Sequence, residues 1–176
     1  FGHPTFKKAK KKKLVNIVCY CINPNHFHFI LEEIIEGGIS EFLKRLGGGY
    51  TKYFNERNKR SGSLFQGRFK SVHIDDDVQA KYLFSYIHLN PLKLFQKNWR
   101  EEGIHDKAKA LVFLDKYKWS SYNDYLLKNR IESKLLDKKS FPDYFSTKKD
   151  FKKEIFEWIE NESLRKSDFR RGKNSP

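Results

Sequence analysis

Two histidines, His26 and His28, flank Phe27 near the end of an apolar stretch that runs from Leu14 to Leu31. Asn23-Pro24-Asn25 is a turn sequence, and the β-branched and aromatic residues on either side of it predict one strand before the turn and another after it. Alternate side chains of a strand point to the same face, so the two imidazoles would project together, about 6.6 Å apart along the strand. Two imidazoles on one face can bind one metal ion, which makes this pair a candidate metal site.

The chain carries an excess of positive charge. It has 176 residues and a formal net charge of +14, with Lys in excess of Arg. The charge favours a polyanionic partner, most simply nucleic acid, although a lysine-rich proteome would produce the same composition. The run from Lys7 to Lys13 is compatible with phosphate contacts or with a solvated face. The length suits one medium domain, or one domain with a small C-terminal extension.

The two cysteines, Cys19 and Cys21, lie two residues apart on the first predicted strand, where a mutual disulfide is geometrically awkward. No second Cys pair is present to complete a zinc site, so we interpret both as buried small apolar residues in a reduced setting. We expect no signal peptide, and the sequence given has no apolar run long enough to span a membrane. We therefore expect a cytoplasmic location in a prokaryotic cell. Because the chain begins at Phe1 and contains no Met, we also expect that its natural N-terminus is missing.

Helical periodicity appears in four further places. Apolar residues at helical spacing predict a first helix that Ser40 would cap and that Gly47-Gly48-Gly49 should weaken or bend. Acidic residues at Asp75-Asp76-Asp77 predict the start of a second helix, which Pro91 would end. Lys93 to Lys118 shows no clear pattern. The predicted helices are Glu41 to about Asn58, Asp75 to about Asn90, Trp119 to about Lys128, and Lys148 to Asn161, followed by a basic tail from Arg165 to Pro176.

A further strand is predicted from Arg68 to Ile74. In that strand Arg68 and Lys70 would share one face, with Phe69 on the other. Cations that alternate with an aromatic residue suit a nucleic-acid backbone with a stacked base. An ordinary half-exposed strand would show the same alternation, so both interpretations stay open.

The second helix carries a second set of candidate residues. Tyr86 and Asn90 are four residues apart and share a helix face. The Asn90 carboxamide oxygen, added to the two imidazoles, makes a mixed nitrogen and oxygen site that suits Mg²⁺ or Mn²⁺ better than structural zinc. The phenol of Tyr86 could then attack a phosphodiester. The alternative is that Tyr86 is a core aromatic residue and Asn90 a helix cap before Pro91; periodicity does not distinguish Tyr86 from Tyr82.

Several segments together resemble a known family. In order along the chain they are CYCINPNHFHFIL, YTKYFNERNKRSGSLFQGRFKS, HIDDD, YLFSYIHLNPLK and KWSSYNDY. In this order and at these separations they resemble the single-tyrosine HUH transposases, in the branch of the REP-associated tyrosine transposases and IS200-like elements. The resemblance runs from about Ile17 to Tyr125, more than half of the chain.

The resemblance implies a fold and a set of roles. The implied fold is α+β, a ferredoxin-like antiparallel sheet with helices packed on one side, as a catalytic domain over residues 1–128; a helical basic C-terminal extension would follow over 129–176. Family members normally carry another strand and helix before the CYCINPNH segment, where almost nothing precedes Lys7 here. The implied residues are Tyr86 as the catalytic tyrosine and His26, His28 and Asn90 as metal ligands. The predicted DNA contacts are Arg68 and Lys70, from their alternation with Phe69, and Lys93, which stands where the branch usually has Arg.

The reaction that the resemblance implies is the cleavage and rejoining of single-stranded DNA, often at a hairpin-forming element end. It leaves a 5′-phosphotyrosine and a free 3′-OH and requires Mg²⁺ or Mn²⁺ but not ATP. The first alternative is a non-catalytic nucleic-acid-binding relative, which would bind in a salt-sensitive way and cleave nothing. A zinc-stabilised structural domain is the second alternative, although the chain has few soft ligands for it. Monomer and homodimer both stay open.

Overall fold

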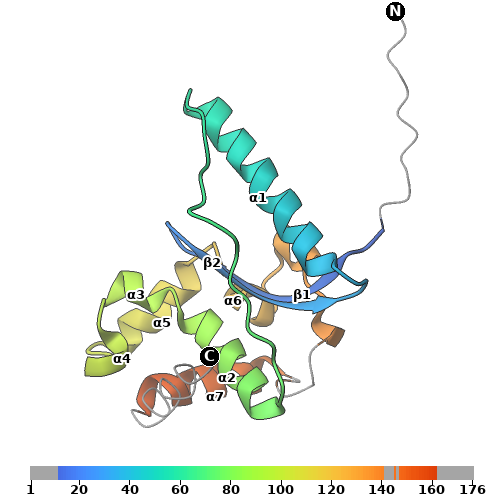
Figure 1. The fold of residues 1–176 in the computed structure, drawn as a ribbon. Helices are drawn as coiled ribbons and strands as arrows, with labels where there is room; N and C mark the ends of the chain where they lie inside the picture. Colours follow the sequence, from blue (N-terminus) through green and yellow to red (C-terminus); the bar gives the residue numbers. More distant parts are fainter. Residues whose placement is uncertain (1–11, 141–144, 146, 162–176) are drawn as a thin grey trace, which may run out of the picture. The chain divides into compact units, whose positions relative to one another are not determined.

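The computed structural model describes residues 12–140, 145 and 147–161, and these fall into two compact units. Residues 12–16 and 31–72 form the first unit, and residues 17–30 together with 73–161 form the second. Figure 1 shows the elements in chain order: β1 (Val15–Ile22), β2 (Phe27–Glu33), α1 (Gly38–Arg57), α2 (Asp77–Leu89), α3 (Leu92–Phe95), α4 (Trp99–Glu102), α5 (Lys107–Lys116), α6 (Tyr122–Tyr125), the 3₁₀ helices η1 (Ile131–Leu135) and η2 (Lys138–Ser140), and α7 (Lys148–Glu160).

Strands β1 and β2 form an antiparallel two-stranded sheet, as the sequence predicts. The turn between them is closed by the Asn23 N–H, which donates to the carbonyl of His26 at 2.8 Å. The α+β class is thereby confirmed. The ferredoxin-like arrangement has more strands than this, and the part of the chain that the structure describes contains only β1 and β2 as sheet strands. Residues 7–11 of the lysine run lie outside the described residues, as does the basic tail, whereas Lys12 and Lys13 are described and exposed.

In the first unit, α1 runs without a break through its three glycines. The prediction that Ser40 caps it is wrong, because the helix begins at Gly38 and its N-cap is Gly37, which has a φ of 71°. Glycine suits this left-handed conformation, which other residues adopt at a cost. At Gly38 a Cβ would clash with the carbonyl oxygen of Leu14. The start of α1 is therefore set by the backbone geometry of its two glycines and by Glu33, whose Oε1 accepts the Ile39 N–H at 3.0 Å.

The predicted strand from Arg68 to Ile74 is not formed. Residues 58–76 contain no helix or strand, and both Arg68 and Lys70 are exposed. A strand is stable only when another strand pairs with its backbone, so an alternating sequence is not sufficient by itself. The predicted DNA contacts of these two side chains stay predictions.

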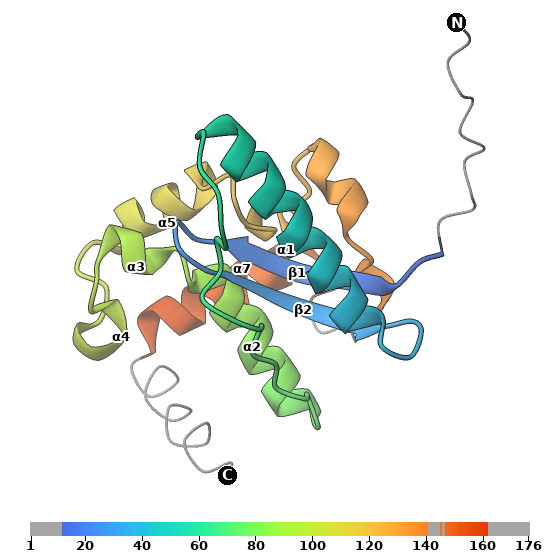
Figure 2. The same ribbon diagram turned by 45° about the horizontal axis from the view of Figure 1, so that its top comes forward.

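In the second unit, α2 matches its prediction closely. Asp76 caps the helix by accepting the Gln79 N–H at 2.7 Å, and Asn90 follows its last residue. Its buried face contacts α7, a helix that starts with a reciprocal capping box between Thr147 and Asp150 (Figure 2). The core of this unit comes from β1, β2, α2 and α7, among others, and includes Val18, Cys19, Cys21, Ile30, Phe84, Ile87, Leu89, Phe151, Ile155, Trp158 and Ile159.

The segment from Lys93 to Lys118, which lacks a clear pattern in the sequence, contains three short helices, α3, α4 and α5. Helix α5 begins with a cap in which Asp106 accepts the Lys109 N–H at 2.9 Å. Helices α3 and α4 have four residues each, and a single turn buries too few side chains to produce a period. Helix α5 has ten residues, of which only Ala110 and Leu114 are buried, so it shows little periodicity either. No helix within the described residues is long and apolar enough to cross a membrane.

The two cysteines are free and fully buried, as predicted. Burial raises the pKa of the Cys21 thiol to about 12 and raises the pKa of Cys19 as well. Both are therefore neutral thiols packed as small apolar groups, and neither is poised to bind a metal as a thiolate.

Candidate functional site

The histidine pair lies at the start of β2. His26 comes directly before the strand and His28 is its second residue, and their ring centroids are 4.9 Å apart at an interplanar angle of 88°. Nδ1 of His26 is 2.7 Å from Oδ1 of Asn25. Since an amide oxygen can only accept, this contact places the ring proton on Nδ1 and leaves a lone pair on Nε2.

The imidazole of His28 has a buried nitrogen without a partner. Its Nε2 makes no hydrogen bond to any described residue. Burial, together with the nearby His26, Lys93 and Arg100, lowers the pKa of His28 to about 4. The pKa of His26 is also lowered, mainly by burial and then by Lys93. Both rings are therefore neutral at pH 7, which is the form that binds a metal ion.

Asn90 and Asn23 connect α2 to the turn between the strands. Asn90 is fully buried, and its Oδ1 accepts a hydrogen bond from Nδ2 of Asn23 at 2.7 Å. The same Nδ2 lies 3.0 Å from Nε2 of His26. Nδ2 of Asn23 thus lies between two acceptor atoms, Oδ1 of Asn90 and Nε2 of His26. The sequence presents Asn23 only as a turn residue, and its position three residues before His26 was the signal that could have found it.

Three atoms are candidate ligands for a divalent cation: Nε2 of His26, Nε2 of His28 and Oδ1 of Asn90. The carboxamide oxygen has a second lone pair beyond the one that Asn23 occupies. The single lone pair of His26 Nε2 faces Nδ2 of Asn23, so a cation bound at this nitrogen would replace that contact. The described residues hold no group of three or more His, Cys, Asp or Glu side chains placed to bind a metal. A closed structural zinc site of that kind is therefore not found in this part of the chain.

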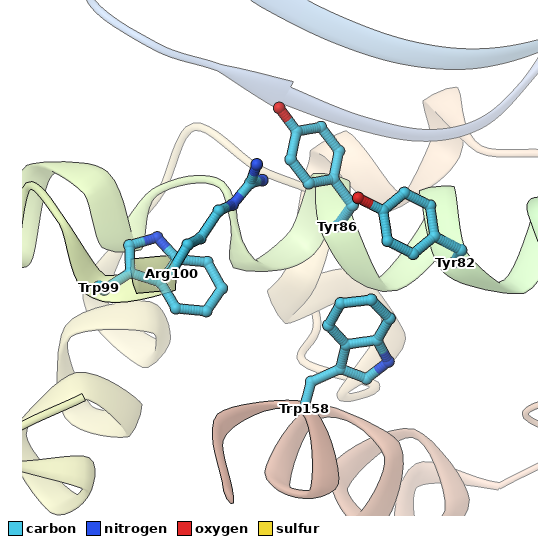
Figure 3. Close-up of a pocket in the computed structure, with 5 residues that line it drawn as sticks. All are labelled: Tyr82, Tyr86, Trp99, Arg100 and Trp158. Carbon is cyan, nitrogen blue, oxygen red and sulfur yellow. The ribbon is translucent and has the colours of Figure 1, made fainter. Parts of the chain in front are cut away.

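Tyr86 lies next to the histidine pair. It is half-buried on α2, one helical turn before Asn90, and its ring centroid is 5.6 Å from that of His28. Tyr82 stacks on Tyr86 at 6.1 Å and contacts Trp158 at 5.2 Å. Figure 3 shows the Tyr86 hydroxyl pointing away from Trp158. The two tyrosines that periodicity could not separate thus have different neighbours, and Tyr86 is the one that contacts His28.

Two cations lie near this cluster. The guanidinium carbon of Arg100 is 4.1 Å from the centroid of the Tyr86 ring. Lys93 interacts with both histidines, and its own pKa is lowered by partial burial and then by Arg100. Sequence reasoning named Lys93 but missed Arg100, which lies in the segment without a periodic pattern. The structure therefore gathers His26, His28, Tyr86, Asn90 and Lys93 within the second unit, whereas Arg68 and Lys70 belong to the first.

Comparison with known proteins identifies the family. A family model described as "Transposase IS200 like" matches residues 3–90, which is half of the chain and includes the histidine pair, Tyr86 and Asn90. No curated protein and no solved structure matches the chain. With half of its length covered by the family model, this chain belongs to the family of IS200-like transposases.

Proposed function

We propose that this protein nicks and rejoins single-stranded DNA with Tyr86 as the nucleophile. Membership of the IS200-like family makes DNA transposition its general function. The observation that carries the finer proposal is the contact between the Tyr86 and His28 rings, whose centroids are 5.6 Å apart. Beside this contact, the His26 imidazole and the Asn90 carboxamide both lie within hydrogen-bonding distance of Nδ2 of Asn23. This arrangement brings a potential nucleophile on α2 next to a potential cation site formed by Asn90 at the end of α2 and the two histidines at the start of β2.

The proposed reaction is a transesterification. The Tyr86 oxygen attacks phosphorus, the bond from phosphorus to the 3′ oxygen breaks, and the phenol proton is lost while the leaving oxygen gains one. The products are a 5′-phosphotyrosine and a free 3′-OH. Because one phosphodiester replaces another, no ATP is needed, and the 3′-OH of another strand can reverse the step to rejoin DNA.

The chain's own residues prepare this step. Neutral His26 and His28, with Oδ1 of Asn90, would hold Mg²⁺ or Mn²⁺, which would supply stabilisation of the charge that develops on the phosphate oxygens. Asn23 orients the Asn90 carboxamide through its 2.7 Å hydrogen bond. Stacking between Tyr82 and Tyr86, at an interplanar angle of 8°, restricts the ring of the nucleophile. Pre-positioning of reacting groups accelerates such reactions because less orientational entropy is lost.

We also propose single-stranded DNA, including hairpin-forming element ends, as the partner. The formal net charge of +14 favours binding to a phosphate backbone, and Lys93 lies close to both histidines. Whether the protein acts as a monomer or a homodimer can be read from the size of the DNA complex in solution.

The test compares two neighbouring tyrosines. Labelled single-stranded DNA from the gene's own flanks is incubated with Mn²⁺, and a covalent protein–DNA band is sought on a denaturing gel. Tyr86→Phe should abolish the band while DNA affinity stays nearly unchanged, and Tyr82→Phe serves as the matched control that retains it. An adduct formed by Tyr86→Phe would reject the assignment. Salt-sensitive binding by the wild type without any adduct would instead identify a non-catalytic relative.

A further inference from the structure

A small recess borders the proposed nucleophile. It is lined by Tyr82, Tyr86, Trp99, Arg100 and Trp158, which come from α2, α4 and α7 (Figure 3). Three of its walls are aromatic residues other than Tyr86, and Arg100 supplies its one cationic side chain. The recess thus combines flat apolar surfaces with a positive charge directly beside the Tyr86 ring.

Two buried N–H donors of this recess have no acceptor. Nη2 of Arg100 and Nε1 of Trp99 are both inaccessible to solvent and make no hydrogen bond to any described residue. Trp99 is only 2% exposed, so its indole nitrogen cannot turn to water without repacking. Buried donors are paired in the great majority of cases, and each unpaired one costs free energy. These two donors belong to adjacent residues that both line the recess, and no described residue supplies an acceptor for either of them.

The charges around the recess favour an anionic acceptor. Arg100 lies close enough to Lys93 to lower its pKa, and the opposing effect of Glu101 on Lys93 is smaller. Arg100 also acts on His28, which is neutral at pH 7. Positive charge is therefore in excess beside Tyr86. A guanidinium that stacks on an aromatic face keeps its edge N–H groups available, and their planar fork matches two oxygens of a phosphate.

We propose that Arg100, assisted by the indole N–H of Trp99, binds the DNA phosphate that becomes joined to Tyr86. The inference rests on the proposed function and deepens it, because it names a second holder of the scissile phosphate besides the histidine and asparagine cluster. The competing explanation is that Arg100 only braces the Tyr86 ring through the cation–π contact. That explanation leaves both buried donors unpaired. A phosphate oxygen would pair with them once the Arg100 and Trp99 side chains move to admit it.

The test separates phosphate binding from bracing by salt dependence. Affinity for a fluorescently labelled single-stranded oligonucleotide is measured by anisotropy at several salt concentrations, in a Tyr86→Phe background that prevents covalent reaction. Arg100→Gln should weaken binding about tenfold and reduce the slope of log affinity against log salt by about 0.7, the value for one lost phosphate contact on a single strand. Loss of a brace alone would leave that slope unchanged. Lys109→Gln, which removes an exposed cation paired with Asp106, is the matched control and should change neither quantity.

Adduct formation by the protein with Tyr86 intact gives the second measurement. Arg100→Gln should slow the adduct about 100-fold, the usual effect of removing a charge-stabilising donor. Trp99→Phe, which keeps the packing but removes the N–H, should slow it by about threefold to tenfold. Should Arg100→Gln fail to fold, Arg100→Lys decides: it should keep the wild-type salt slope but form the adduct about fivefold more slowly. An Arg100→Lys protein with the wild-type rate would overturn the forked contact.

The outcomes distinguish the two proposals. A folded Arg100→Gln protein with wild-type slope and wild-type adduct rate would end the Arg100 assignment and leave the Tyr86 chemistry intact. A wild-type protein that forms no adduct, but whose salt slope responds to Arg100→Gln, would retain the phosphate site and reject the proposed reaction.

Discussion

Helix α2 presents one histidine of its own to the core, and this residue makes a useful comparison with the histidine pair. His88 is fully buried, with Nδ1 2.9 Å from the Phe84 carbonyl oxygen and Nε2 2.8 Å from Oγ of Ser121. The same Oγ accepts the Tyr20 N–H at 3.0 Å. Both ring nitrogens of His88 are therefore satisfied within the protein, whereas Nε2 of His28 has no partner among the described residues.

The pKa does not separate these two environments. Burial lowers the pKa of His88 to about 3 and that of His28 to about 4. A lowered pKa is common to structural and functional histidines, because desolvation penalises the charged ring in both. What differs is the completeness of the hydrogen bonds. A satisfied imidazole stabilises the fold, and an unsatisfied one beside a second imidazole is available for a ligand.

The largest expected effect is on the Mn²⁺ affinity, through the histidine whose ring nitrogen has no hydrogen-bond partner among the described residues. His28→Ala should lower Mn²⁺ affinity at least about 100-fold, because it removes a direct ligand. Mutation of residues that only hydrogen-bond to metal ligands already costs about 10- to 100-fold in affinity. His26→Ala should act similarly. Titration calorimetry with Mn²⁺ measures the effect, and His105→Ala, at an exposed histidine, is the control. Unchanged Mn²⁺ affinity in both variants would remove the ligand assignment.

Replacement of the fully hydrogen-bonded His88 should affect the stability of the fold instead of metal binding. His88→Ala should reduce the free energy of unfolding by about 3 kcal/mol, because it opens a cavity and leaves Ser121 without one hydrogen-bond partner. Urea unfolding measures this change, with His28→Ala as the comparison, where we expect less than about 1 kcal/mol. If His28→Ala proved as destabilising as His88→Ala, both rings would have to be regarded as structural.

The smallest expected effect is a pH dependence. The folded-state pKa of His88, about 3, lies below the ordinary value of 6.5, so the unfolded chain takes up a proton first as the pH falls. Its contribution to stability is complete above pH 6.5 and is lost progressively as the pH falls from 6.5 toward 3, by about 1 kcal/mol between pH 6.5 and 5.5. His88→Gln should therefore show a shallower loss of unfolding free energy between pH 6.5 and 5.5. Parallel curves for wild type and variant would contradict the neutral, buried assignment of His88.

Local sequence patterns predicted the elements that carry the candidate site. The turn at Asn23-Pro24-Asn25, the strands around it and the acidic start of α2 all appear in the structure within a few residues of their expected positions. Alternation and helical spacing depend only on neighbouring residues, so they can be recognised in one sequence. The same reasoning failed for residues 68–74, because a strand also needs a paired neighbour.

By itself, the sequence determined that the His26 and His28 rings lie close together, that Tyr86 and Asn90 lie one turn apart on α2 and its C-cap, and that the chain belongs with the IS200-like transposases. Only the tertiary structure decided that Asn23, in the turn between the strands, bonds to Asn90 at the end of α2. It also decided that Arg100 lies over the Tyr86 ring while Nη2 of Arg100 has no partner among the described residues. Contacts between segments more than ten residues apart depend on how the core packs and which loops close around it. No periodicity along the chain records that packing, so these partners become visible only in three dimensions.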